Sequence, residues 1–266
     1  MPQGPKHDVE MVLVEFIRQK VEESGAEGVV VGLSGGVDSA LVAKLCVMAI
    51  GPEKVKNLFL PSTTTPEQDR RDVRELSTLL GTELVEIEIS PMVEAFRSAL
   101  PEMGRRELLG NVMARVRMIV LYHYARMENR LVMGTGNKSE LLMGYFTKFG
   151  DGGCDHLPIG DLYKTEVWEL ARKLGLPSSI IEKEPSAGLW PGQTDEGEMG
   201  VRYEHLDRIL AGIERGLPLE EISRRTGIDM TVVEMVWKKH LASVHKRKMP
   251  IIPKVGLRTI GIDWRE

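Results

Sequence analysis

The residues with the clearest chemical meaning lie in a glycine-rich segment, 32–39, which reads Gly-Leu-Ser-Gly-Gly-Val-Asp-Ser. Valines precede it and an apolar pattern at helical spacing follows it, so the segment is predicted to join a strand to a helix. Gly35 and Gly36 let the backbone approach a bulky anion, and amides at the start of a helix attract negative charge. Two serines add hydroxyl donors. Asp38 would repel a bare phosphate, so its presence favours a bridging divalent cation.

Two common nucleotide-binding patterns do not fit this segment. It lacks the lysine of G-x-x-x-x-G-K-[ST], and its glycines do not match G-x-G-x-x-G. The segment resembles instead the S-G-G-x-D-S loop of the ATP pyrophosphatase superfamily. Those enzymes hold the terminal phosphates of ATP, attack its α-phosphate and release pyrophosphate. An ordinary glycine-rich turn between a strand and a helix is the alternative interpretation.

A second polar segment, 134–140, reads Gly-Thr-Gly-Asn-Lys-Ser-Glu and follows a strand predicted at 130–133. Glu140 is a hard oxygen ligand, and Thr135 adds a hydroxyl donor. Because parallel strands end at one edge of a sheet, we expect Glu140 to lie near Asp38. Two carboxylates facing a triphosphate make a magnesium site, since Mg²⁺ takes one or two protein carboxylates together with phosphate oxygens. Taken alone, Glu140 is also typical of a solvated acid at the start of a helix.

The segment 144–158 is rich in glycine and holds aromatic and ionisable side chains, a composition that core packing does not explain. Loops of this kind usually serve function. A helix is expected to start near Lys164, where a lysine opposes the helix dipole. Lys164 is therefore a candidate phosphate ligand, and a surface lysine that extends to solvent is the alternative.

Hydrophobic periodicity predicts an α/β fold in which strands alternate with helices. The expected strands are 29–31, 54–60, 83–89 and 130–133. The expected helices include 9–21, 66–80, 108–126, 203–213 and 219–244. This order predicts a doubly wound, mostly parallel sheet with helices on both faces and a helical C-terminal segment. The polar loop Ser62–Thr65 follows a strand, where such sheets bind ligands, but a plain linker explains it equally well.

Composition limits the classes of function. The chain has 266 residues, 42% of them hydrophobic, which supports a substantial core. Its net charge of −4 indicates no nucleic-acid partner, although 219–236 mimics a helix-turn-helix. The second helix of that pattern is acidic or apolar where base-reading residues would lie. No apolar run approaches membrane-spanning length, and two cysteines without metal or redox spacing favour a cytoplasmic location.

Four blocks together resemble the ammonia-dependent NAD⁺ synthetases. They read L-S-G-G-V-D-S, G-T-G-N-K-S-E, G-Y-F-T-K-F-G-D-G-G-x-D and L-x-K-T-E-V, and the similarity spans about residues 8–250. The third block separates this family from relatives that thiolate tRNA or make GMP, asparagine or argininosuccinate. The resemblance implies a Rossmann-like fold of the adenine nucleotide alpha hydrolase type. It implies one domain over 1–266, made of a core sheet at about 8–185, a flap at about 186–200 and C-terminal helices at about 201–248.

The implied reaction joins ammonia to the nicotinate carboxylate of deamido-NAD⁺. ATP first converts this carboxylate to an acyl-adenylate with release of pyrophosphate, and ammonia then displaces AMP to give NAD⁺. Carried over residue by residue, Asp38 and Glu140 would hold Mg²⁺. The positions implied to bind ATP are Gly32, Leu33, Ser34, Gly35, Gly36, Val37, Asp38, Ser39, Thr135, Lys164 and Ser186. The positions implied to bind deamido-NAD⁺ are Arg115, Lys148, Asp155, His245 and Lys246.

Ammonia is mainly ammonium at neutral pH, so the second step needs a proton acceptor. Asp151 is our candidate, and burial or a neighbouring acid would have to raise its pKa. We expect free ammonia as the nitrogen donor, because no room for a glutaminase domain precedes residue 8 and neither cysteine suits a nucleophile.

The resemblance also implies a symmetric homodimer, for which the helix 108–126 could supply the interface. A monomer that buries this helix is the alternative. Two other functions stay open at this point. The first is another adenylating, amidating or thiolating enzyme of the ATP pyrophosphatase superfamily, and the second is a nucleotide sensor or nucleic-acid-binding module.

Overall fold

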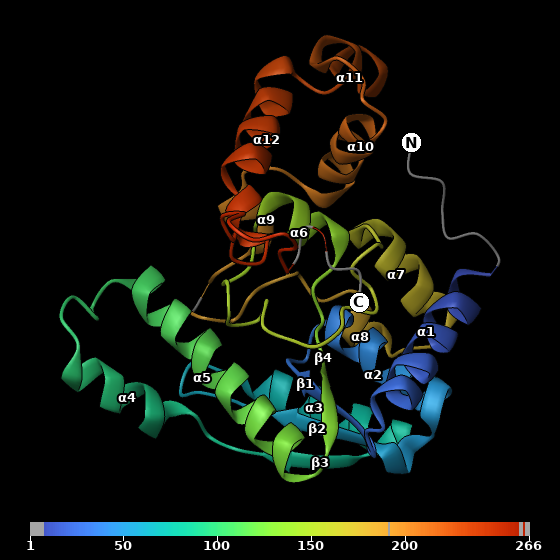
Figure 1. The fold of residues 1–266 in the computed structure, drawn as a ribbon, viewed down its shortest axis with the longest axis vertical. Coiled ribbons are helices and arrows are strands. Elements are labelled where there is room, and N and C mark those ends of the chain that lie inside the picture. The colour runs from blue at the N-terminus through green and yellow to red at the C-terminus, as the bar shows by residue number, and fades with distance from the viewer. Residues whose placement is uncertain (1–7, 191, 261–262, 264–266) are drawn as a thin grey trace.

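The computed structural model describes residues 8–190, 192–260 and 263 (Figure 1). Its four strands are β1 (Gly28–Leu33), β2 (Val55–Phe59), β3 (Glu83–Glu86) and β4 (Arg130–Met133). Its α-helices are α1 (Val9–Ser24), α2 (Val37–Ile50), α3 (Glu67–Leu80), α4 (Ser90–Ala99), α5 (Arg106–Met127), α6 (Lys138–Met143), α7 (Lys164–Lys173), α8 (Ser178–Ile181), α9 (Asp195–Met199), α10 (Tyr203–Glu214), α11 (Leu219–Thr226) and α12 (Met230–Ala242). Two short 3₁₀ turns complete the described elements, η1 (Pro52–Lys54) and η2 (Val244–Lys246).

The four strands form one parallel sheet in the order β3-β2-β1-β4. The register places Val31 of β1 opposite Asn57 of β2 on one side and opposite Met133 of β4 on the other. The chain therefore moves outward from β1 to β3 and then returns to the opposite side of β1. This reversal makes a switch point between β1 and β4, and open α/β sheets bind ligands beside such a point. The segments after β1 and β4 are the two polar signatures 34–39 and 134–140.

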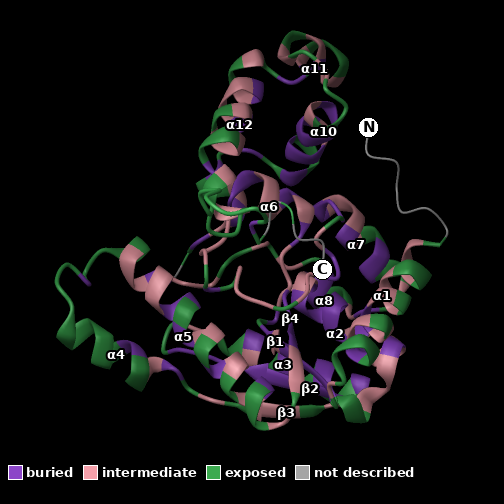
Figure 2. Cartoon of the chain, in the orientation of Figure 1, coloured by how far each residue is buried: buried purple, intermediate pink, exposed green. Residues whose placement is uncertain are grey.

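Helices cover both faces of the sheet, as the sequence predicted. Val29 and Val31 pack in a core with α1, α2 and α7, whereas Val30 joins a second core with α4 and α5. The alternation arises because successive side chains of a strand point to opposite faces. Figure 2 shows the burial that results, with the buried residues concentrated along β1, β2 and α2. The expected mostly parallel, doubly wound α/β fold is confirmed.

The C-terminal helices form a core of their own above the sheet (Figure 1). Tyr203, Leu206 and Val233 are fully buried in it, and Met143 of α6 and Tyr163 connect it to the segments that follow β4. This cluster brings α10 against the first turns of α6 and α7. The division of the chain near residues 185 and 201 stays a prediction.

Two of the differences from the expected bounds have a clear physical cause. The strand predicted over 83–89 ends at Glu86, although Ile87 and Ile89 still donate hydrogen bonds to the carbonyls of Phe59 and Pro61. The stretch predicted as helical over 219–244 is broken between α11 and α12, because Gly227 adopts a φ of +70° and ends α11. Among the described residues, none of the helices combines the length and the apolar character needed to span a bilayer.

Candidate active site

The glycine-rich loop after β1 is held in shape by its own serines. The Ser34 amide donates to Ser39 Oγ over 3.1 Å, and the Ser39 hydroxyl donates to the Gly36 carbonyl over 3.1 Å. Gly35 has a φ of +78°, a conformation that an L side chain rarely adopts. The loop leads directly into α2, whose first turn carries Asp38 and whose unpaired amides carry partial positive charge.

Asp38 and Glu140 meet at the same residue, although they come from distant parts of the chain. Asn137 donates from Nδ2 to Asp38 Oδ1 over 2.9 Å, and its backbone amide donates to Glu140 Oε2 over 3.1 Å. The Asn137 side chain also accepts from the Glu140 amide at 3.0 Å, which completes a capping box at the start of α6. Glu140 is therefore a helix-capping acid that also lies beside Asp38.

Lys164 at the start of α7 forms an ion pair with Asp38. The Lys164 side chain is 2% exposed, so it is not the surface lysine of the alternative interpretation. Its ammonium lies 5.4 Å from the centre of the Tyr203 ring and 6.0 Å from that of Trp168. Burial opposes the charge of Lys164, but the carboxylates of Asp38 and Glu140 outweigh it and raise the pKa of the lysine.

The same region holds more carboxylate than ammonium. Burial, followed by repulsion from Asp38, raises the pKa of Glu140 well above its ordinary value. Burial also raises the pKa of Asp195, which α9 brings within the electrostatic reach of Lys164. Asp195 Oδ2 accepts from the Tyr203 hydroxyl at 3.1 Å, whereas its Oδ1 atom is buried without a hydrogen-bond partner. A divalent cation would offset this excess of negative charge.

The donor set therefore fits Mg²⁺ shared with a ligand. Within the described ranges, no group of three or more His, Cys, Asp or Glu side chains is arranged to hold a metal by itself. Mg²⁺ is commonly bound by one or two carboxylates together with substrate phosphates and water. Asp38 and Glu140 can supply those carboxylates beside a loop built to receive an anion.

A buried acid on α10 contacts the first turns of the two helices that carry Glu140 and Lys164. Asp207 is fully buried and accepts from the Ser139 hydroxyl at 2.5 Å and from the Thr165 amide at 2.9 Å. The Lys164 amide donates to Ser139 Oγ over 2.9 Å. Asp207 thus joins the first turns of α6 and α7, so the C-terminal helical core positions both Glu140 and Lys164.

The two remaining candidate ATP contacts are less constrained. Thr135 is partly buried directly after β4, and Ser186 is exposed in the segment that leads to α9. Ser186 Oγ accepts from the Gly188 amide at 3.1 Å. Both side chains retain hydroxyl capacity for a ligand.

Two candidate substrate lysines exchange contacts between the glycine-rich loop 144–153 and the C-terminal segment 244–248. Lys148 Nζ donates to the carbonyls of His245 and Lys248 over 2.8 and 3.2 Å. Lys246 Nζ donates in turn to the carbonyls of Gly144 and Phe146 over 2.7 and 2.8 Å. The structure thus brings Lys148, His245 and Lys246 together, with both ammonium groups bound to backbone oxygens.

Two other candidates for substrate binding differ in how far protein contacts already occupy their side chains. Arg115 on α5 is exposed and donates from Nη2 to the Lys148 carbonyl over 3.2 Å, which places it beside that group. Asp155 accepts from the Val132 amide at 2.7 Å and from the Tyr122 hydroxyl at 3.0 Å. The carboxylate of Asp155 therefore already anchors the loop to β4.

Asp151 lies in the glycine-rich loop and accepts from the Thr147 amide at 2.9 Å. Its carboxyl group is reachable by solvent but stands among many protein atoms. This partial desolvation raises the pKa of Asp151, while the amide of Thr147 and the ammonium of Lys246 oppose the shift. A raised pKa is what a carboxylate needs in order to accept a proton near neutral pH.

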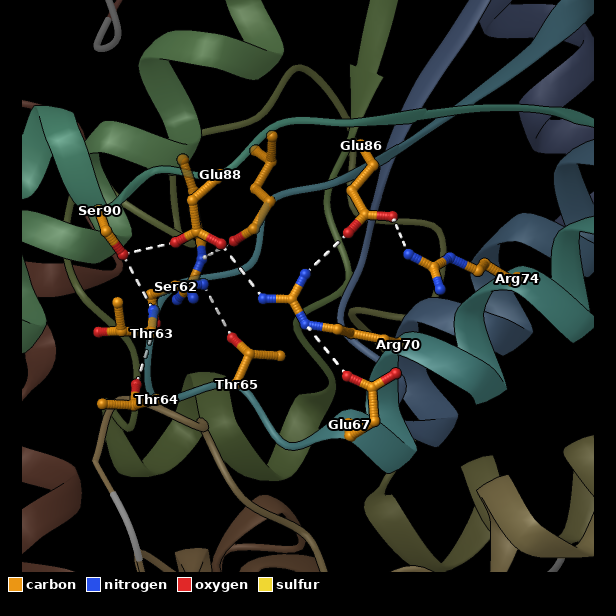
Figure 3. Close-up of polar contacts among 12 residues, drawn as sticks. Ser62, Thr63, Thr64, Thr65, Glu67, Arg70, Arg74, Glu86, Glu88 and Ser90 are labelled. Carbon is orange, nitrogen blue, oxygen red and sulfur yellow. Dashed lines mark hydrogen bonds and ion pairs between the residues drawn. The ribbon is translucent and has the colours of Figure 1, made fainter.

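The polar loop after β2 is organised by an arginine of α3, as Figure 3 shows. Arg70 contacts Glu86 at 2.8 Å and Glu88 at 3.2 Å, and Glu88 in turn accepts from the Ser90 hydroxyl at 2.5 Å. Ser90 Oγ accepts from the Thr63 amide at 2.9 Å. This chain of contacts fixes the loop at the carboxyl edge of the sheet.

Sequence reasoning missed several residues that shape the site. Asn137 had a usable signal, because an asparagine followed three residues later by glutamate marks a capping box. The others, Asp195, Asp207 and Lys183, are single charged residues outside any periodic pattern. Lys183 contacts Asp69 and the Gly35 carbonyl, beside the loop that follows β1.

Comparison with known proteins decides the family. The family model described as NAD synthase matches residues 9–250 of the chain. The chain belongs to the NAD synthase family.

Curated relatives and solved structures of this family resemble the chain over nearly its whole length. The NH₃-dependent NAD⁺ synthetase of Archaeoglobus fulgidus is 52% identical over 244 residues, which cover 91% of this chain and 95% of the relative. That of Methanosarcina acetivorans is 48% identical over 246 residues, 91% of this chain and 96% of the relative.

Two solved structures superpose closely. The NMN synthetase of Francisella tularensis is 41% identical with a TM-score of 0.83, covering 92% of this chain and 97% of that one. The NH₃-dependent NAD synthetase of Campylobacter jejuni, solved with a nitrate ion, is 36% identical with a TM-score of 0.80, covering 93% of this chain and 98% of that one. The expected adenine nucleotide alpha hydrolase-like fold is confirmed for this member of the family.

The buried ion pair makes a prediction about stability. Lys164→Met leaves Asp38 and Glu140 without their cation, so we expect the free energy of unfolding at pH 7 to fall by about 3–5 kcal/mol. Urea unfolding monitored by circular dichroism measures this change. The loss should shrink as the pH falls, because protonation of Glu140, whose pKa is already raised, removes one of the repelling charges.

Lys20→Met is the matched control, because Lys20 pairs with Glu23 on the surface, where Glu23 is 51% exposed. An exposed pair contributes about 1 kcal/mol or less. If Lys164→Met were as stable at pH 7 as Lys20→Met, the carboxylates would not depend on the buried ammonium.

Proposed function

We propose that this chain converts deamido-NAD⁺ to NAD⁺ with ATP and ammonia, as a carbon–nitrogen ligase. The observation that supports it most is the convergence of Asp38 and Glu140 on Asn137, beside a glycine loop, in a chain 46–52% identical to curated NH₃-dependent NAD⁺ synthetases. The geometry alone would also fit another enzyme of the ATP pyrophosphatase superfamily. Membership of the NAD synthase family favours NAD⁺ synthesis over that alternative.

The first step must activate a carboxylate that is stabilised by resonance and lacks a good leaving group. A nicotinate oxygen attacks the α-phosphorus of ATP, the bond to the bridging oxygen breaks, and pyrophosphate leaves with the electron pair. The acyl-adenylate that results has AMP as its leaving group. Catalysis of such a step rests on positioning and on neutralising charge.

We assign the ATP positions to the loop and its surroundings. The amides and hydroxyls of 32–39 would bind the phosphates that leave as pyrophosphate, and Lys164 would neutralise part of their charge. Thr135 and Ser186 would add hydroxyl contacts. Asp38 and Glu140 would hold Mg²⁺, which when bound neutralises charge on the triphosphate.

The second step needs neutral ammonia next to the acyl-adenylate. Asp151 would take a proton from ammonium, and the nitrogen would then attack the acyl carbon while AMP leaves with the electrons of the broken C–O bond. The nitrogen would lose one further proton to solvent, which leaves the neutral amide of NAD⁺. The cationic side chains of Arg115, Lys148 and Lys246 would bind the anionic groups of deamido-NAD⁺. His245 and Asp155 would contact other parts of the same substrate. The contacts of Lys148 and Lys246 with backbone carbonyls would exchange for contacts with the substrate.

We also propose that the protein is cytoplasmic and works as a homodimer. The cysteines Cys46 and Cys154 are free, as is usual in a reducing compartment. On α5, Ile119 and Met127 are 55% and 59% exposed, and Phe96 on the adjacent α4 is 42% exposed. A twofold contact through α4 and α5 would remove this apolar surface from water.

A direct assay tests the function. Protein incubated with ATP, Mg²⁺, ammonium chloride and deamido-NAD⁺ should form NAD⁺, AMP and pyrophosphate in equal amounts, measured by chromatography. Glutamine in place of ammonium should give no NAD⁺. A comparable rate with glutamine would contradict the nitrogen donor, and a failure to form NAD⁺ from ammonia would contradict the function.

The same assay separates two substrates within the family. Amidation of nicotinate mononucleotide would give NMN, the product that names the Francisella enzyme. We expect deamido-NAD⁺ to be the better substrate by kcat/KM, since the curated relatives that are 48% and 52% identical over most of the chain are named NH₃-dependent NAD⁺ synthetases. A higher kcat/KM for the mononucleotide would reassign the substrate and leave the chemistry unchanged.

The role of Asp151 has a specific test. Asp151→Asn should keep the release of pyrophosphate in the first turnover but lower NAD⁺ formation by about 10²–10⁴-fold, because the amide cannot accept the proton. Rapid-quench measurement of both products separates the two steps. Because the carboxylate accepts a proton only when it is itself deprotonated, wild-type amidation at constant ammonium should fall as the pH drops through the raised pKa of Asp151. Unchanged NAD⁺ formation in Asp151→Asn would exclude the residue.

A charged side chain introduced into the proposed contact tests the dimer interface. Ile119→Glu places a carboxylate in the proposed apolar contact, so sedimentation should show a shift from dimer to monomer at micromolar concentration. Leu79→Glu is the control, because Leu79 on α3 is 63% exposed and α3 packs in the core on the other face of the sheet from α4 and α5. A wild-type monomer, or a dimer that both variants retain, would contradict the interface.

A further inference from the structure

Lys183 reaches the glycine-rich loop from a distant part of the chain. It follows α8, and its ammonium lies 2.5 Å from Asp69 Oδ1 on the first turn of α3. The same ammonium donates to the Gly35 carbonyl over 3.3 Å. The Asp69 side chain is 11% exposed and the Lys183 side chain 30% exposed, so the pair is partly shielded from water.

This contact selects the orientation of one peptide plane. In a trans peptide the carbonyl oxygen and the next amide hydrogen point in opposite directions. When Lys183 holds the Gly35 carbonyl on the side of Asp69, the Gly36 amide must point to the other side, where it meets Ser34 Oγ at 3.2 Å. A flipped peptide would turn a carbonyl oxygen toward an incoming phosphate, which would repel it.

The contact between the loop and α3 is also close. A Cβ added at Gly35 would lie 3.2 Å from Asp69 Cβ and 3.3 Å from Asp69 Cα, so the backbone of the loop touches the helix. Lys183 bridges the two across this contact. The chain then continues from Lys183 through Pro185, whose carbonyl accepts from the Asp195 amide at 3.0 Å. The lysine therefore links the loop, α3 and the segment that carries Ser186.

We propose that Lys183 is a positioning residue for the phosphate-binding loop, acting through the Gly35 carbonyl and with Asp69 as its anchor. It fixes the loop with its amides directed at the polyphosphate of the nucleotide and does not itself contact the phosphates. The role rests on the proposed use of ATP. Asp69 and Lys183 act as one unit, so loss of either should have the same effect on the loop.

The experiment measures binding of ligands that differ in phosphate content. Dissociation constants for ATP, pyrophosphate and adenosine are determined by calorimetry, with Mg²⁺ present, for wild type, Lys183→Met, Asp69→Asn and the double variant. We expect each single variant to raise the dissociation constants of ATP and pyrophosphate about tenfold, since a hydrogen bond to a charged group is lost. The dissociation constant of adenosine should hardly change. The double variant should be no weaker than either single one.

Two further variants complete the design. Lys183→Arg should retain most of the wild-type affinity for ATP and pyrophosphate, because a guanidinium can bridge the same two oxygens. Lys173→Met removes a lysine that pairs with Glu10 on the surface, and it should change none of the three constants. Melting temperatures of all variants report whether the fold is kept, and the ratio of ATP to adenosine affinity separates loop positioning from general loss of structure.

The contrary results are distinct. If Lys183→Met lowers the affinity for ATP while Asp69→Asn binds ATP as well as or better than wild type, the positioning role is wrong. Lys183, once released from Asp69, would then be a direct phosphate ligand. If Lys183→Met lowers the affinities for ATP and adenosine equally, the lysine is merely structural. If wild type itself binds neither ATP nor pyrophosphate, the proposed function fails, whatever the variants do.

Discussion

The site depends on an imbalance of charge in a place with little water. Asp38, Glu140 and Asp195 face the ammonium of Lys164, and burial raises the pKa of both Glu140 and Asp195. Within the described part of the chain, this ammonium does not neutralise the three carboxylates. Because a low dielectric strengthens attraction and repulsion alike, the arrangement favours a further cation. A cation that arrives with a nucleotide would relieve a repulsion that folding leaves in place.

The topology of the sheet makes this imbalance possible. β1 and β4 are neighbours, so the loops that follow them open side by side, and Asn137 joins their two acids. The C-terminal helices then close the arrangement through Asp207, which is fully buried and fully engaged with α6 and α7. The helical core above the sheet thus helps to position Glu140 and Lys164.

Much of the fold and part of the site could be predicted from the sequence. A run of valines ending in glycine indicated β1, and alternating apolar residues indicated β3. The shared edge of parallel strands predicted that Asp38 and Glu140 lie close. Local patterns could not reveal Asp195, Asp207 or Lys183, since their partners are 8 to 148 residues away and only tertiary packing brings them together.

The sequence also said little about which hydrogen bonds each candidate side chain makes in the folded protein. It marked Lys148 and Lys246 as cations near a dinucleotide, but not that backbone carbonyls already hold both. The early end of β3 has a similar origin, because Ile87 and Ile89 keep hydrogen bonds to the neighbouring chain without continuing a regular ladder. Which carbonyl a long side chain reaches is decided by how distant segments pack.

The ion pair between Asp38 and Lys164 spans 126 positions of the chain. Closing so long a loop carries a large entropic penalty, which must be met by the sheet and its helices before the pair can form. Until then Asp38 stays hydrated and bears no desolvation penalty. We therefore expect the pocket to form only after the scaffold around it is in place, which keeps an isolated charge out of the interior of the folding chain.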